Sequence, residues 1–288
     1  MEWAQERKSV VLSDLEEIKI KIAESFSKET EFQKQIKAYG HGLIGRVNWN
    51  RDEKISDFFE GKKTRPGHIV ANADYKREFW LDKIDKAIST SKICIIKSSS
   101  GQGKSAFLYR YAYEKWSEDN TYIMRLAETT EQIELIRNYL QFRASLRVPI
   151  LLLIDDIGWG TRLWSSIIQE CAALGIRVLV TIRNEDWYRF SQEEMTGYEV
   201  IEPELKLDEA KNIFYSFKNE NKVDENVTST EWAYEKIGKP ELLIEYIYLI
   251  THGKMLEERL RNQIKEITRQ GEDPSKIEIL RRSSLANA

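Results

Sequence analysis

Short apolar runs alternate with helical patterns along the middle of the chain. The runs with the character of buried strands are 93–96, 121–126, 150–154, 176–182 and 198–201. Helical periodicity lies between them, at 106–116, 130–145 and 163–174. Near-continuous Ile, Val and Leu strands that are separated by helices are typical of a parallel sheet covered on both faces. The pattern therefore predicts an α/β fold, a three-layer sandwich around a parallel sheet.

Both ends of the chain have helical patterns only. Between 5 and 38 the apolar residues recur mostly every three or four positions, at Val11, Leu15, Ile18, Ile22, Phe26, Phe32 and Ile36. This amphipathic stripe predicts one helix or a pair, which either packs on its own domain or binds a partner as a coiled coil does. Residues 207–270 also have helical patterns, including a helix that is predicted to begin with Pro240, because proline favours the first turn.

Composition favours a soluble globular protein. The 288 residues include 44 Lys and Arg against 47 Asp and Glu, which gives a net charge of −3. This balance argues against a dedicated nucleic-acid-binding protein, which usually has a basic domain or stripe. No run approaches the ~20 apolar residues of a membrane-spanning helix. Because the N-terminus has mixed charge and Cys94 and Cys171 have no CxxC spacing, we expect a cytoplasmic protein with no membrane partner.

A loop rich in Ser and Gly follows the first predicted strand and precedes a helix. Its sequence, KSSSGQGKS from 97 to 105, matches the P-loop pattern at Gly103, Lys104 and Ser105, while Ser98 replaces the leading glycine. Small residues let successive backbone N–H groups surround phosphates, and the helix N-terminus adds its dipole. We predict that Lys104 binds the β- and γ-phosphates and that the Ser105 hydroxyl binds Mg²⁺. The predicted nucleotide-binding residues are Ser99, Ser100, Gly101, Gln102, Gly103, Lys104, Ser105 and Ala106.

Two carboxylates, Asp155 and Asp156, follow the apolar strand at 150–154. Open parallel sheets bind ligands at the carboxyl ends of their strands, so we predict that Asp155 holds Mg²⁺ together with Ser105. Asp156 is then placed to orient the attacking water. Many fast P-loop ATPases have Glu at this second position, and Asp is shorter by one methylene. We therefore expect slow hydrolysis, which a turnover of ~10 s⁻¹ would contradict.

The strand at 176–182 leads to Arg183. If this strand lies between the loop strand and the Asp155 strand, Thr181 and Arg183 emerge beside the γ-phosphate. An arginine in that place distinguishes a triphosphate from a diphosphate through charge-assisted hydrogen bonds. An ordinary surface arginine is an equally good interpretation of this residue alone.

Four segments together resemble the STAND class of signal-transduction P-loop NTPases. They are SSSGQGKS, LLLIDDIGWG, VLVTIRNEDW and EKIGKPELLIEYI, and the resemblance covers roughly 69–270. It implies that Arg183 is the sensor arginine of the class and that Pro240 is its GxP proline, near the nucleotide. It also implies that the base is adenine, and it puts 74–80 in the place of the family's adenine-side motif. We expect the sheet order 5-1-4-3-2 of this fold, numbered from the loop strand.

The expected organisation has four parts. Residues 1–68 form a helical N-terminal segment and a connector, 69–206 the P-loop nucleotide-binding domain, 207–270 a helical lid domain, and 271–288 the start of a winged-helix module. The resemblance implies a switch that binds ATP or ADP with Mg²⁺, hydrolyses slowly, and forms a homo-oligomer on binding ATP. It also implies effector and sensor domains that this chain lacks, and a role in immune or antiphage defence.

Two other functions stay open at this stage. One is an AAA-like ATPase that remodels or loads a protein or DNA partner, for which vigorous partner-stimulated turnover would be the sign. The other is a module that holds nucleotide and never hydrolyses it. Among the remaining residues, the basic cluster Lys62-Lys63-Thr-Arg65 is short and is interpreted as solvated surface. Trp159 and Trp164 are expected in the core in preference to the site.

Overall fold

The computed structural model describes most of the chain between 42 and 255. The described residues are 19–24, 27, 42–59, 61–125, 127, 129–158, 163–187, 195–238, 241–255, 258, 261–262 and 265. Trp159, the predicted winged-helix start and most of the N-terminal stripe lie outside them. Residues 19–24 are helical and exposed, Ile20 by 59%, so the packing of this helix stays a prediction. No helix in the described part is long and apolar enough to cross a membrane.

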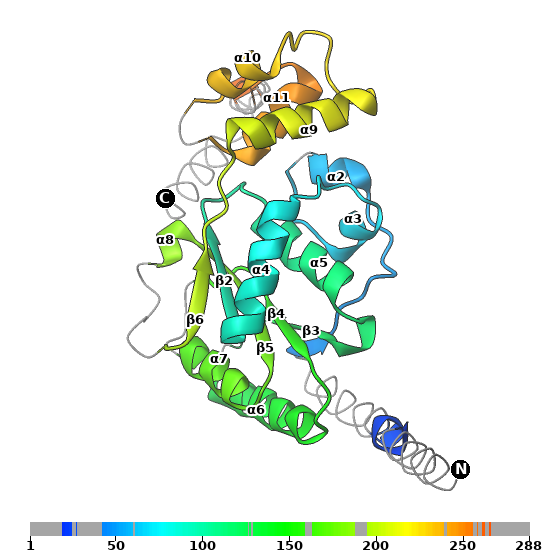
Figure 1. Cartoon of the computed structure of the whole chain (residues 1–288), viewed down its shortest axis with the longest axis vertical. Coiled ribbons are helices and arrows are strands. Elements are labelled where there is room, and N and C mark those ends of the chain that lie inside the picture. Colours follow the sequence, from blue (N-terminus) through cyan, green and yellow to red (C-terminus); the bar gives the residue numbers. More distant parts are fainter. Residues whose placement is uncertain are drawn as a thin grey trace, which may run out of the picture.

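A six-stranded sheet lies at the centre of the molecule (Figure 1). Its strands are β1 (Ile44–Arg46), β2 (Ile93–Ser98), β3 (Thr121–Met124), β4 (Leu151–Ile154), β5 (Arg177–Arg183) and β6 (Tyr198–Ile201), in the order β1-β3-β4-β5-β2-β6. All neighbours are parallel except β1 and β3. Numbered from the loop strand β2, the five parallel strands have the order 5-1-4-3-2. The sheet differs from the expected one by β1, an additional antiparallel strand at its edge.

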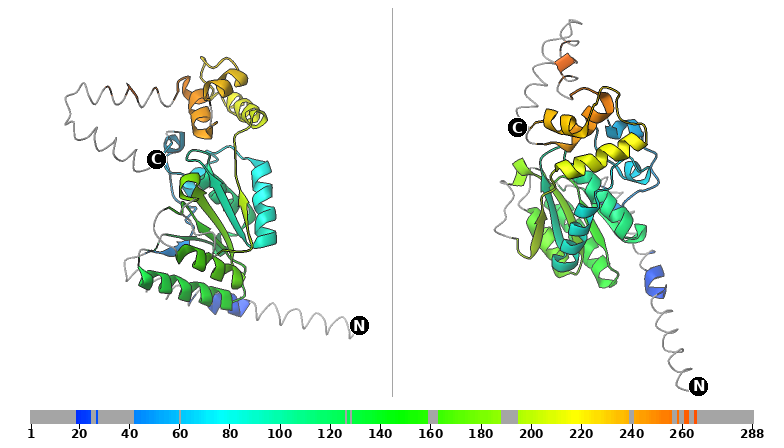
Figure 2. Two further views of the ribbon diagram at one scale, coloured as in Figure 1. Left: turned by 90° about the vertical axis from the view of Figure 1, so that its left-hand side faces the viewer. Right: turned by 45° about the horizontal axis from the view of Figure 1, so that its top comes forward.

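Helices cover both faces of the sheet, which confirms the predicted α/β sandwich (Figure 2). One face carries α4 (Glu78–Ser91) and α5 (Lys104–Lys115), and the other carries α6 (Thr130–Ser145) and α7 (Leu163–Ala173). Successive strand residues point to opposite faces. Ile95 of β2 thus packs under α6 and α7, whereas Ile96 packs under α4 and α5. Trp164 of α7 is buried in the core, as expected.

Three helices stand beyond the carboxyl ends of the strands and are called the lid helices (Figure 1). They are α9 (Leu207–Asn219), α10 (Thr230–Lys236) and α11 (Leu243–His252), and they share a separate apolar core. The prediction that the last of them begins at Pro240 is wrong, because the helix begins at Leu243. The Glu241 carbonyl accepts a hydrogen bond from Gln102, and Leu242 is extended. Pro240 itself lies outside the described residues.

The predicted connector forms regular structure. After β1 come two short helices, α2 (Ile55–Phe59) and α3 (Pro66–Val70). Phe59 packs edge-on against Phe217 of α9, with ring centroids 6.0 Å apart. Ile69 of α3 belongs to the core under α5. The chain therefore runs from the sheet edge past the lid helices and back to α4. The short elements η1 (Glu118–Asn120) and α8 (Asn184–Trp187) complete the described fold.

Candidate functional site

The loop between β2 and α5 turns through two glycines with left-handed backbone. Gly101 has a φ of +85°, and Gly103, the residue that caps α5, has a φ of +81°. A Cβ on Gly101 would lie 2.5 Å from Cγ2 of Ile244 in α11, so a side chain there has neither the conformation nor the space it needs. The first turn of α5 has N–H groups without partners in the helix, the property that lets a helix N-terminus bind an anion.

Lys104 begins α5, and its ammonium lies inside the loop. Nζ donates to the carbonyl oxygens of Ser98 and Ser99, both at 2.9 Å. Burial lowers the pKa of Lys104, and the nearby carboxylate of Asp156 acts in the opposite direction. These two hydrogen-bond acceptors are neutral, so they orient the ammonium without cancelling its charge.

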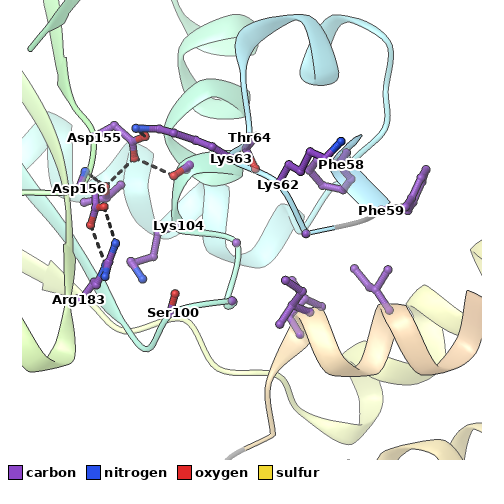
Figure 3. A pocket seen from close by; sticks show the side chains of 18 residues that line it. Phe58, Phe59, Lys62, Lys63, Thr64, Ser100, Lys104, Asp155, Asp156 and Arg183 are labelled. Carbon is purple, nitrogen blue, oxygen red and sulfur yellow. Dashed lines mark hydrogen bonds and ion pairs between the residues drawn. The ribbon is translucent and has the colours of Figure 1, made fainter. Parts of the chain in front are cut away.

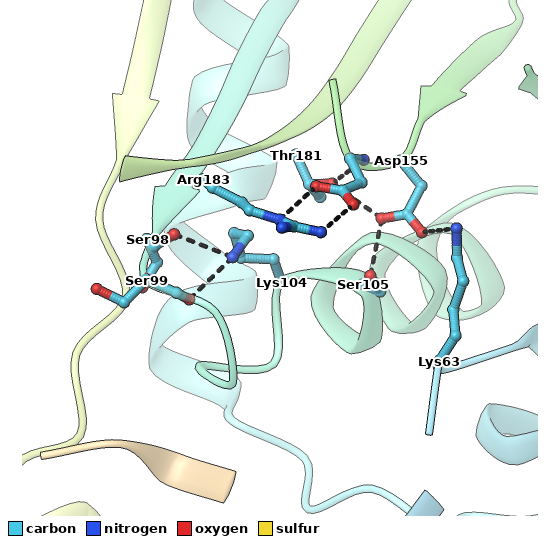
Figure 4. A network of polar contacts seen from close by, with 9 residues as sticks. Lys63, Ser98, Ser99, Lys104, Ser105, Asp155, Thr181 and Arg183 are labelled. Atoms are coloured by element: carbon cyan, nitrogen blue, oxygen red, sulfur yellow. Dashed lines mark hydrogen bonds and ion pairs between the residues drawn. The ribbon is translucent and has the colours of Figure 1, made fainter. Parts of the chain in front are cut away.

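Asp155 lies at the centre of a polar network (Figure 4). Its Oδ1 accepts hydrogen bonds from the hydroxyls of Ser105 and Thr181, each at 2.8 Å. Its side chain is only 4% exposed, and Oδ2 is buried without a hydrogen-bond partner. A carboxylate oxygen in that state, next to a serine hydroxyl, fits Mg²⁺, which prefers hard oxygen ligands and keeps several waters. The structure thus brings together the two side chains predicted to hold the metal.

Asp156 and Arg183 form an ion pair at the wall of the site. Arg183 donates from Nε and Nη2 to the two oxygens of Asp156, at 3.1 and 2.8 Å. This carboxylate raises the pKa of Arg183. Asp156 has a φ of +61°, uncommon for a residue with a side chain, and its N–H donates to Thr181 Oγ1. The two side chains, for which the sequence predicts separate roles, therefore hold each other in the structure.

A cavity of about 380 Å³ lies between the loop, the strand ends, α11 and the segment that includes the end of α2 and residues 61–64 (Figure 3). Ser100, Gly101, Gly103, Lys104 and Ser105 line it from the loop. Asp155, Asp156, Thr181 and Arg183 line it from the strand ends, and Leu243, Ile244 and Ile247 from α11. The predicted phosphate, metal and sensor residues therefore share one cavity.

Some predicted residues do not face this cavity. The Ser99 hydroxyl accepts from Asn184 at 3.1 Å, Gln102 Nε2 donates to Glu241 O at 2.6 Å, and both residues line a second, polar pocket. Ala106 lines a smaller neighbouring pocket. The side chains of Ser99 and Gln102 are thus already engaged elsewhere. Their predicted contact with a nucleotide stays a prediction, for which they offer the backbone N–H.

One wall of the cavity, which no sequence pattern predicts, comes from the N-terminal part of the chain. We call Phe58, Phe59 and residues 61–64 the N-terminal wall, because all of them line the cavity. The side chain of Lys63 is 67% exposed, in agreement with the interpretation of this cluster as solvated surface, but Lys63 also lines the cavity. Its Nζ lies 3.6 Å from Oδ2 of Asp155. No local pattern marks this lysine, because the chain brings it to Asp155 only through the packing of α2 and α3.

Arg77 was also missed as a link between the loop and the lid helices. It is 5% exposed, and its guanidinium donates to the carbonyls of Gln102 and Glu204, at 3.1 and 2.9 Å, and to the carboxylate of Glu209 in α9. One buried side chain thus fixes the phosphate loop, the stretch after β6 and the first lid helix. Its place inside the predicted adenine-side motif was the one available signal.

The comparison with family models agrees with this geometry. Residues 56–194 match the family described as Novel STAND NTPase 5. Among curated proteins none matches the chain. One similar solved structure is the Walker-type ATPase PABY2304 of Pyrococcus abyssi, 12% identical, with a TM-score of 0.45 over 75% of this chain and 78% of that one. The matched region contains the loop, both aspartates and Arg183, and over residues 56–194 the chain thus matches the STAND class of NTPases.

Proposed function

We propose that the protein is an ATP- and ADP-binding switch of the STAND type that hydrolyses ATP slowly with Mg²⁺. The observation that carries the proposal is the buried Asp155 carboxylate. Two hydroxyls hold one of its oxygens, and the other is buried without a hydrogen bond next to the phosphate loop. Burying an ionised carboxylate in this way is costly unless a positive group balances it. The Lys63 ammonium lies 3.6 Å from this oxygen, beyond hydrogen-bond distance, whereas Mg²⁺ would bind the oxygen directly.

The phosphate side of the site follows from the loop. The backbone N–H groups at 99–103 and the first turn of α5 would surround the phosphates, with Lys104 adjacent to them. Ser105 and Asp155 would hold Mg²⁺, which neutralises charge on the β- and γ-phosphate oxygens during transfer. Pro240, outside the described residues, stays a predicted nucleotide contact.

The base side of the site is the smaller pocket beside the cavity. Tyr75, Leu81 and Phe107 line it, together with Leu243 and Ile247 from α11, and its charged lining residues are Asp74, Arg77 and Arg110. Apolar surfaces with few polar groups are typical of pockets that hold a nucleobase. Because this pocket includes residues of the 74–80 motif, it supports the assignment of that motif to the adenine side.

The Asp156–Arg183 pair accounts for slow hydrolysis. Asp156 can orient a water only when its oxygens are free of Arg183, and Arg183 can contact a γ-phosphate only when it leaves Asp156. Binding of ATP would draw the guanidinium toward the phosphate and release the carboxylate. Each turnover then requires the separation of the Asp156–Arg183 pair before the hydrolysis step.

The lid helices are placed to respond to the nucleotide. The N–H of Ile244 donates to Gly101 O at 3.0 Å, and Gln102 and Arg77 also join the loop to the lid side. A change in the loop on nucleotide exchange would therefore change the fit of these helices. We infer that this movement leads to the homo-oligomer and to activation of an effector, in immune or antiphage defence.

Calorimetric titration with ATP and ADP, with and without Mg²⁺, tests the proposal. We expect both nucleotides to bind, ATP with the stronger dependence on Mg²⁺, and Lys104→Ala to abolish measurable binding. Binding unchanged in Lys104→Ala would contradict the phosphate-loop assignment. Size measurement with ATP then separates the functions: slow turnover with assembly supports the switch, and fast partner-stimulated turnover supports an AAA-like ATPase. Binding without any turnover would indicate a nucleotide-holding module.

A further inference from the structure

Lys63 approaches the site from a different side than the other cations. Figures 3 and 4 show its side chain running from the N-terminal wall to Asp155, with Lys104 and Arg183 on the opposite side of that carboxylate. The distance of 3.6 Å to Asp155 Oδ2 exceeds that of a hydrogen bond, and the side chain is 67% exposed. The ammonium is thus attracted to the carboxylate but is not fixed by it.

The charges at the cavity give Lys63 a second partner. Of the described residues that line the cavity, four are cationic and two are carboxylates, an excess of positive charge that suits a polyphosphate. Arg183 is paired with Asp156, and Lys62 with Asp57 at 2.7 Å. Lys63 instead faces the oxygen of Asp155 that fits Mg²⁺. A metal on that oxygen would repel the ammonium, and the phosphates bound to the metal would attract it.

We propose that Lys63 contacts the terminal phosphate of bound ATP, as a second phosphate-binding lysine that the N-terminal wall supplies. The inference rests on the proposed function of the site. A compact ammonium on a flexible four-carbon stem can move from a carboxylate to a phosphate without a change in the backbone. ADP lacks the terminal phosphate, so Lys63 has no phosphate partner of this kind when ADP is bound.

The same wall also contacts the lid helices. A Cβ on Gly61 would lie 2.8 Å from Cδ1 of Ile244, and Phe59 packs on Phe217. The position of Lys63 is therefore joined to the position of α9 and α11 through one short segment. This gives the terminal phosphate a direct physical connection to the lid helices, in addition to the connection through the loop.

Calorimetry on the full chain with ATP and with ADP, in the presence of Mg²⁺, tests the inference. The variants are Lys63→Met, Lys63→Arg, and Lys54→Met as the control, since Lys54 is an exposed lysine of the same region that does not line the cavity. We expect Lys63→Met to weaken ATP binding about tenfold, the effect of one charge-assisted hydrogen bond. ADP binding should change by less than about twofold on the same scale.

Lys63→Arg should keep most of the affinity for ATP, and Lys54→Met all of it. Equal losses for ATP and ADP would mean that Lys63 supports the cavity rather than contacts the terminal phosphate, and would overturn the inference. Unchanged ATP binding in Lys63→Met would overturn it as well. Failure of the unsubstituted chain to bind any nucleotide would overturn the proposed function itself, so the two results are distinguishable.

Discussion

Two walls of the cavity differ in composition and in how they are built. The core wall, formed by the loop and the strand ends, is polar, and its side chains hold one another through short hydrogen bonds, as at Ser105, Asp155 and Thr181. The opposite side, formed by the N-terminal wall and α11, is mostly apolar, with Lys63 as an exception that reaches across. The groups that would bind phosphate and metal are thus concentrated on the core wall, whereas the opposite side closes the cavity through apolar contacts. Substitutions in the core wall should therefore affect nucleotide binding and hydrolysis, and substitutions in the opposite side should affect the packing of the lid helices.

The largest effect is expected from the centre of the core wall. Asp155→Asn keeps the shape but removes the charge that fits Mg²⁺. The Mg²⁺-dependent part of ATP affinity should fall by at least about 100-fold, since loss of groups that only support a metal ligand already costs 10–100-fold. Titration of ATP with and without Mg²⁺ measures this. Asp119→Asn, at an exposed ion pair on the far edge of the sheet, is the matched control. Full Mg²⁺ dependence in Asp155→Asn would remove this residue from the metal site.

The next effect separates chemistry from binding on the same wall. Asp156→Asn should lower turnover about 100-fold, the usual scale for a group that assists proton transfer, while ATP affinity stays the same or rises, because Arg183 no longer has to leave a carboxylate to reach the phosphate. Its pair with Arg183 is about one-third exposed, so the free energy of unfolding should change by at most about 1 kcal/mol. Single-turnover hydrolysis and denaturant unfolding measure the two quantities. A variant that hydrolyses at the original rate would show that another group orients the water.

A smaller effect is expected where the two walls meet. Gly101→Ala and Gly175→Ala both put a side chain on left-handed backbone, at φ of +85° and +82°, with a cost of about 1–2 kcal/mol. Only at Gly101 does the new methyl group meet Ile244, because nothing lies within 4 Å of a Cβ on Gly175. Gly101→Ala should therefore lower the unfolding temperature more. When Ile244→Ala is added to both variants, their unfolding temperatures should differ by less. If the two unfolding temperatures still differ by the same amount, the contact between the new methyl group and Ile244 is not the cause.

The smallest effect concerns protons at Lys104. Burial lowers the pKa of this lysine, and bound phosphates would raise it again. At an alkaline pH between the two pKa values, ATP binding should take up a fraction of a proton, and affinity should fall as pH rises through the lower one. Binding enthalpies in buffers of different ionisation heat measure the uptake. Lys104→Arg stays protonated and should show none. If the original chain releases protons when it binds ATP, the proposed proton uptake by Lys104 is wrong.

The same contrast explains what could be predicted from the sequence. The core wall lies in a continuous strand, loop and helix, and the acids and Arg183 stand at strand ends that a parallel sheet brings to one edge. Local patterns were therefore enough to predict Lys104, Ser105 and Asp155 as neighbours. They could not show that Asp156 and Arg183 pair with each other, because that depends on side-chain conformations.

The side of the cavity formed by the N-terminal wall and α11 could not be predicted from local sequence patterns. Lys63 and Ile244 are 181 positions apart and meet at the cavity only through the packing of Phe59 on α9 and of Gly61 on α11. Nothing in either local sequence indicates the other. The strand β1 was missed for a similar reason, because its three residues become a strand only when β3 offers them an edge. The conformation of β1 and the position of the N-terminal wall next to α11 therefore depend on tertiary contacts rather than on local sequence preference.

Ile244 lies between Gly61 and Gly101, one from each wall, and both contacts exist because neither glycine has a side chain. Closure at this point thus depends on an apolar fit, whereas phosphate binding depends on charge. The apolar contact and phosphate binding should therefore respond differently to temperature and to salt. Cooling weakens apolar contacts, and added salt screens charges but leaves apolar contacts intact. The apolar contact at Ile244 should therefore weaken in the cold at any ionic strength, while nucleotide affinity falls with salt at any temperature.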